Sequence, residues 1–87
     1  MDKITLLSLS NDLKRITASI QAGSAKNAQR FSNEAKRWVK TDVDKSYLKN
    51  LMKKIASSLD RKNDLKKAED CLMYSVLLQN QALHPSK

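Results

Sequence analysis

Residues 71–83 read CLMYSVLLQNQAL, and this stretch decides the fold. It contains no charged residue, and seven of its first eight residues are apolar. A helix built from it is apolar almost all the way round, which is typical of a helix that is buried on several sides. The sequence therefore predicts a helical protein whose C-terminal helix is central to its packing.

The composition of the chain also favours helices. Its 87 residues include one glycine and one proline, which disfavours a turn-rich β protein and favours a few long helices with short connections. A chain of this length forms one domain, so we predict a single all-α domain, a small helical bundle, over residues 1–87. The hydrophobic share of 40% is sufficient for a core.

The N-terminal part of the chain carries two apolar stripes with helical spacing. Their members are Leu6, Leu9, Leu13, Ile16 and Ile20 in the first stripe, and Ala28, Phe31, Ala35 and Trp38 in the second. On one uninterrupted helix the stripes lie about 45° apart, which favours a single helix over about residues 2–40. The competing interpretation ends a helix at Gly23 and lets Ser24 cap the next one.

Two further helices are predicted over about residues 42–59 and 64–83, followed by a frayed tail at 84–87. The connection between them is short, so they form an antiparallel hairpin against which the N-terminal helix packs. The apolar spacing predicts one stripe of the last helix as its core face. This stripe consists of Leu65, Ala68, Leu72, Val76 and Leu83.

The positive charge is concentrated in residues 25–67, which account for the whole formal net charge of +8. Such a surface is typical of a protein with an anionic partner, although a solvated lysine-rich face explains the same charge. Lysine outnumbers arginine here, and lysine is the less specific ligand of phosphate. The candidate anion-binding residues are Lys45, Lys49, Lys53, Lys54, Arg61, Lys62, Lys66 and Lys67.

The residue types that catalysis and metal binding need are scarce. One cysteine, Cys71, and one histidine, His84, cannot supply the four ligands of a structural zinc site. Cys71 lies in the apolar stretch, where burial raises the pKa of a thiol and makes it unreactive. A single glycine excludes a glycine-rich phosphate loop. We therefore expect no enzymatic activity, no cofactor, no metal ion and no small-molecule substrate.

The apolar arc of the last helix is wider than one stripe, and a helix in a small monomeric bundle buries about one stripe. Exposed apolar patches usually mark interaction sites, and small helical chains often complete their core by forming oligomers. We therefore expect a non-enzymatic protein-protein interaction module or accessory subunit that forms a homo-oligomer through this helix. The alternatives are a groove for a different protein partner and complete burial of the helix within the chain. The candidate interface residues are Cys71, Tyr74, Leu77, Leu78 and Trp38.

The alternative function is a nucleic-acid-associated accessory protein that binds backbone phosphates through its lysine-rich face. The longest uncharged stretch is shorter than the about 18–20 residues that a membrane-spanning helix needs. The N-terminal residues also lack the features of a signal peptide. We therefore expect a cytoplasmic protein that is not integral to a membrane.

Overall fold

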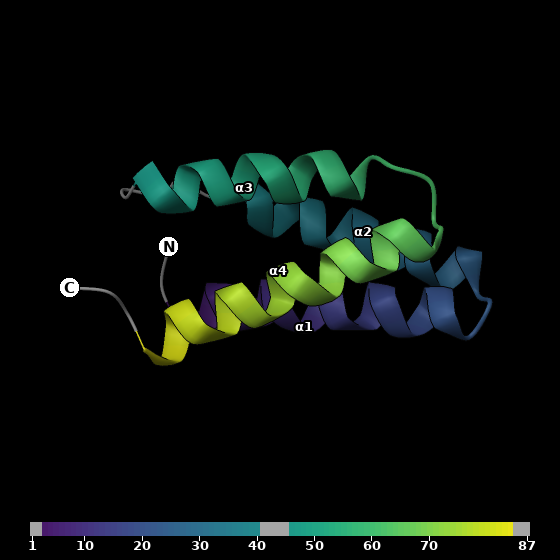
Figure 1. Ribbon diagram of the computed structural model, residues 1–87, viewed down its shortest axis with the longest axis horizontal. Coiled ribbons are helices and arrows are strands. Elements are labelled where there is room, and N and C mark those ends of the chain that lie inside the picture. The colour runs from purple at the N-terminus through teal and green to yellow at the C-terminus, as the bar shows by residue number, and fades with distance from the viewer. Residues whose placement is uncertain (1–2, 41–45, 85–87) are drawn as a thin grey trace.

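The computed structural model describes residues 3–40 and 46–84, which form four α-helices (Figure 1). These are α1 (Lys3–Gln21), α2 (Ala25–Val39), α3 (Ser46–Leu59) and α4 (Leu65–Leu83). The described residues contain no β-strand, so the predicted all-α bundle is confirmed. The predicted helix ends at residues 59 and 83 are confirmed as well. The predicted helix start at residue 42 and the tail at 85–87 lie outside the described residues.

The chain breaks between α1 and α2 at Gly23, so the favoured prediction of one long N-terminal helix is wrong. Gly23 has a φ of +79°, in the left-handed region that favours glycine. Its amide donates to the Ile20 carbonyl at 3.0 Å. The Ser24 amide donates to the Ser19 carbonyl at 2.8 Å, so the two bonds close the end of α1. The Ser24 hydroxyl then accepts a hydrogen bond from the Asn27 amide at 3.3 Å, which confirms the alternative interpretation with Ser24 as the cap of α2.

The helices run alternately in opposite directions along the long axis of the molecule (Figure 1). α1 packs mainly against α4 and α2, whereas α3 makes smaller contacts with α2 and α4. The molecule measures 39 × 20 × 19 Å. The predicted hairpin of α3 and α4 is present, but α4 packs more extensively on α1 than on α3.

One hydrophobic core lies between the four helices. Its buried members are Leu6, Leu9, Leu13, Ile16, Ala35, Leu48, Leu51, Met52, Ile55, Leu59, Cys71, Leu78 and Ala82. α1 and α3 supply most of the large side chains, whereas Leu78 is the one leucine that α4 contributes. The core is therefore filled mainly from α1 and α3.

Two buried hydroxyl groups on α1 hold it close to the backbone of α4. Ser10 Oγ donates to the Ser75 carbonyl at 2.7 Å, and Thr17 Oγ1 donates to the Ala68 carbonyl at 2.8 Å. The partners are seven residues apart on each helix, as expected for two antiparallel helices in register. Because α1 touches the backbone of α4 at these two points, α4 carries small side chains there, and most of its large apolar side chains point elsewhere.

Candidate functional site

One side of α4 carries large apolar side chains that remain exposed, and we call it the outward face of α4. It consists of Leu65, Leu72, Met73, Val76, Leu77 and Leu83. Their exposed fractions run from 36% at Leu77 to 69% at Leu65. At about 100° per residue they lie within an arc of about 140°, so they form one strip along the helix, with the exposed Glu69 and Asn80 between its members. A strip of this kind is a candidate interaction site.

The outward face corrects the predicted core face of α4. Leu65, Leu72, Val76 and Leu83 were predicted to be buried and are exposed, and only Ala68 of that stripe is buried. The physical reason is the close approach of α1, which leaves room for small side chains on the inward side of α4. The spacing of apolar residues correctly predicts that these residues share one side of the helix, but it does not predict that this side faces solvent.

The predicted interface residues divide between the core and the surface. Cys71 and Leu78 are 0% exposed, so the prediction that they lie in an interface is wrong. Tyr74 and Trp38 are partly buried and pack against the core. Leu77 is the one predicted interface residue that lies on the outward face of α4. Burial raises the pKa of the Cys71 thiol to about 11, as expected for an unreactive core cysteine.

Trp38 is held by a contact that was not predicted. Its Nε1–H donates to Asp12 Oδ2 at 3.0 Å and joins α2 to α1. Asp12 is 2% exposed, and Arg15 lies 3.6 Å from its other carboxylate oxygen. Burial raises the pKa of Asp12 and the charge of Glu34 raises it further, whereas the hydrogen bond from the indole lowers it. Since the contact occupies the indole N–H, Trp38 stabilises the bundle itself.

Part of the predicted basic surface is present on α3. Lys49, Lys53 and Lys54, which we call the α3 lysines, are exposed and make no ion pair with any residue that the structure describes. Lys62, in the connection between α3 and α4, is also exposed. Lys45 lies outside the described residues. The α3 lysines are therefore the part of this surface that is open to an anion.

Two other predicted anion-binding residues share one acidic partner. Arg61 and Lys66 lie 3.6 and 3.1 Å from the two carboxylate oxygens of Asp70. Exposed ion pairs of this kind contribute at most about 1 kcal/mol. The carboxylate nevertheless reduces the positive charge at this end of the molecule, so these residues attract an anion less than the α3 lysines do.

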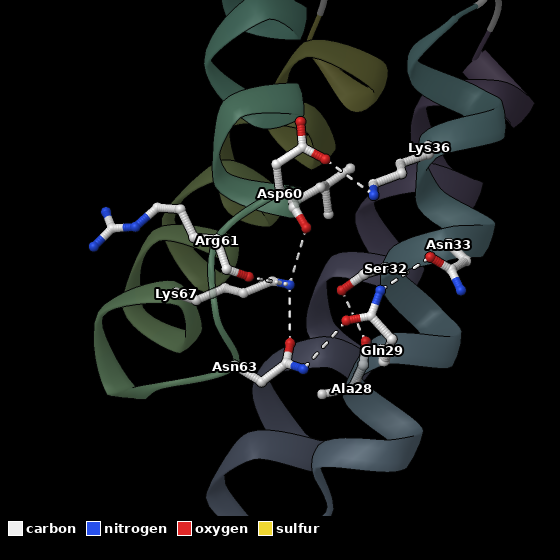
Figure 2. A network of polar contacts seen from close by, with 10 residues as sticks. Ala28, Gln29, Ser32, Asn33, Lys36, Asp60, Arg61, Asn63 and Lys67 are labelled. Atoms are coloured by element: carbon white, nitrogen blue, oxygen red, sulfur yellow. Dashed lines mark hydrogen bonds and ion pairs between the residues drawn. The ribbon is translucent and has the colours of Figure 1, made fainter.

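Lys67 is buried, so its predicted role in anion binding is wrong. Its side chain is 0% exposed, and its Nζ donates three hydrogen bonds (Figure 2). The acceptors are the carbonyls of Leu59 at 3.1 Å and Arg61 at 3.2 Å, and Asn63 Oδ1 at 2.9 Å. Leu59 is the last residue of α3, so the ammonium group closes the end of that helix. All three of its donors are occupied within the chain.

The surroundings of Lys67 lower the pKa of its ammonium group. Desolvation lowers its pKa most, and the charge of Lys36 lowers it further, while Asp60 and Asp64 oppose the shift. Lys36 and Asp60 form an ion pair at 3.0 Å in the same network (Figure 2). The network thus joins α2, α3, α4 and the connection between α3 and α4.

Neither a metal site nor a membrane-spanning helix is found among the described residues. Within 3–40 and 46–84, no three His, Cys, Asp or Glu side chains come together as a metal site would require. None of the described helices combines the length and hydropathy that crossing a membrane requires. No protein-family model, curated protein or solved structure matches this chain. The outward face of α4 and the α3 lysines are therefore the candidate functional surfaces of the described residues.

Proposed function

We propose that this protein is a non-enzymatic helical interaction module or accessory subunit that self-associates through the outward face of α4. The observation that carries the proposal is the strip of six large apolar side chains on that face. Burying apolar surface stabilises a complex by about 25 cal/mol per Å², so exposing this strip to water has a free-energy cost that a partner relieves.

The scarcity of charged residues on the outward face also supports an apolar partner. No charged residue occurs from Cys71 to Leu83, so most of the strip can be desolvated without burying an ion. The charged surface of α4 is confined to its first turns, where Lys66, Glu69 and Asp70 are found. This separation of apolar and charged surface resembles the apolar centre and polar rim of protein interfaces.

The first prediction concerns the association state. The double variant Leu72→Asp/Val76→Asp should be monomeric at concentrations at which the wild type is associated, because it places two charges in the centre of the strip. The measurement is sedimentation equilibrium over a range of concentrations, with circular dichroism to verify that the variant remains helical.

A matched control adds the same two charges to exposed positions on another helix. Asn50→Asp/Ser57→Asp on α3 should associate like the wild type. A wild-type chain that stays monomeric at about 1 mM would contradict the proposal, because an association free energy of about 4 kcal/mol would already be detected at that concentration. So would a control that dissociates as readily as the α4 variant.

The α3 lysines support nucleic-acid binding as a second candidate function. They are exposed, carry like charges and lack ion-pair partners among the described residues, which is the arrangement expected of a surface that neutralises phosphates. Lysines contact the sugar-phosphate backbone without reading base sequence. This function would therefore be sequence-independent and strongly dependent on salt.

The second prediction tests this surface by its salt dependence. Binding of Lys49→Glu/Lys53→Glu to duplex DNA should be weaker than that of the wild type. The slope of log K against log salt should also be smaller by about 1.8, since each lost phosphate contact removes about 0.9. Lys3→Glu/Lys26→Glu changes the net charge equally at exposed positions on α1 and α2 and should retain the wild-type slope. An equal loss of DNA affinity and of salt slope in both variants would show that binding depends on net charge alone and not on the α3 lysines.

A further inference from the structure

Four of the six residues of the outward face have the same spacing in both directions along α4. Leu65, Leu72, Val76 and Leu83 follow one another at steps of seven, four and seven residues, and all four are exposed. Because this spacing is symmetric, a second copy of the helix in antiparallel orientation places its own four residues opposite those of the first copy. The midpoint of the four positions is residue 74.

We infer that two copies of this chain pair through α4 in antiparallel orientation, about a two-fold axis that crosses the contact at the level of position 74. The inference rests on the proposed self-association and adds the orientation and register of the pair. With the axis at that position, Leu65 lies opposite Leu83 of the second copy, and Leu72 lies opposite Val76. Every leucine or valine of the four then meets another one, and none meets water.

The four side chains point in a common direction that leaves the core intact. At about 100° per residue they lie within about 40° of one another, as the contact strip of a helix pair requires. The buried Cys71 and Leu78 lie about 140–160° from Val76, on the opposite side of α4. A second copy therefore covers the outward face without displacing any core side chain.

Glu69 favours the antiparallel orientation over the parallel one. It is exposed and lies one turn after Leu65, within the same strip. In a parallel pair in register, the two Glu69 carboxylates would face each other across the contact, which repels and desolvates both charges. In the antiparallel pair Glu69 lies at the level of position 79 of the second copy, next to the exposed Asn80. The amide group of Asn80 can donate a hydrogen bond to that carboxylate.

The size of the strip indicates how tightly the copies associate. Leu65 and Leu83 are 18 residues apart, which corresponds to about 27 Å along the helix. A strip of that length and about 10 Å wide is smaller than the about 800 Å² per partner of a standard protein interface. The pair should therefore form and separate with changes in concentration, as weak complexes do.

Disulfide mapping in the double variant Leu65→Cys/Leu83→Cys tests the orientation. In the antiparallel pair, position 65 of each chain is next to position 83 of the other, within the reach of a disulfide. Positions 65 of the two copies are then about 27 Å apart and cannot be joined. After mild oxidation we expect a covalent dimer whose proteolytic peptides link position 65 to position 83. The wild type, whose Cys71 is buried, should remain free of disulfides and serves as the control.

The possible results separate this inference from the proposed function. Links of 65 to 65 and 83 to 83 would show a parallel pair and overturn the inference while leaving self-association intact. A chain that is dimeric in solution but yields no covalent dimer would overturn the register. A second experiment mixes Leu72→Cys with isotope-labelled Val76→Cys and should yield mainly the mixed covalent dimer. A chain that remains monomeric would overturn the proposed function itself.

Discussion

Replacing Leu78 by alanine is expected to lower the free energy of unfolding by about 3 kcal/mol. Leu78 is 0% exposed and is the one leucine that α4 contributes to the core. Truncation removes buried apolar surface and leaves a cavity that α1 can fill only in part, because its side chains already contact α4. Leucine and alanine are both good helix formers, so helix propensity contributes little to the difference.

Val76→Ala is the matched control for this prediction. It lies two residues away on the same helix but on the outward face, at 47% exposure, so its effect should stay within about 0.5 kcal/mol. Both variants are compared by urea unfolding at protein concentrations low enough that association does not add to stability. Equal destabilisation by the two substitutions would mean that α4 has no distinct inward and outward faces.

The face of α4 that points into the core could not be predicted from the sequence. Apolar residues lie on almost every side of the helix, so their spacing allows two core faces. What selects between these faces is the close contact with Ser10 and Thr17 of α1, which requires Ala68 and Ser75 rather than leucine on the inward side. That contact joins residues more than fifty positions apart in the chain, and a helical projection does not contain it.

The break at Gly23 could have been predicted with a length argument. A helix over residues 2–40 would be about 58 Å long, at about 1.5 Å per residue. α3 and α4 have 14 and 19 residues, or about 21 and 28 Å, so they could cover only about half of its apolar stripe. Folding α2 back on α1 covers both stripes, and this gain outweighs the helical hydrogen bonds lost at the break. The helix propensity of one glycine, about 1 kcal/mol less favourable than that of alanine, is too small to decide whether the helix breaks at Gly23.

Charged residues were the least predictable part of the candidate site. The sequence identified Lys49, Lys53 and Lys54 correctly as exposed, because they lie opposite the apolar face of α3. It also grouped Lys67 with them, although that lysine is buried. A charge count does not distinguish a solvated ammonium group from one that binds the carbonyls at the end of a neighbouring helix. The position of Asp12 beside the apolar stripe of α1 is the sequence signal that indicates its burial.

Lys67→Met tests whether the buried ammonium group stabilises the fold. The substitution keeps much of the side-chain volume but leaves the Leu59 and Arg61 carbonyls and Asn63 Oδ1 without their donor. A buried acceptor without a partner costs about 1–3 kcal/mol, and removing the desolvated charge offsets part of that cost. We expect a net loss of about 2 kcal/mol in the free energy of unfolding. Lys66→Met, which removes an exposed lysine paired with Asp70, should change it by less than about 1 kcal/mol.

The difference in the free energy of unfolding between the wild type and Lys67→Met should also depend on pH, which gives an independent test of the role of Lys67. The pKa of Lys67 is lowered from its ordinary 10.5 in the folded chain, chiefly by desolvation, so the unfolded chain binds more protons just below pH 10.5. The free energy of unfolding of the wild type should therefore rise relative to that of Lys67→Met as the pH rises through this window. The same difference between the wild type and Lys66→Met should stay constant. A Lys67→Met variant as stable as the wild type at pH 7 would show that desolvation cancels the three hydrogen bonds. The closure of α3 would then depend on apolar packing alone.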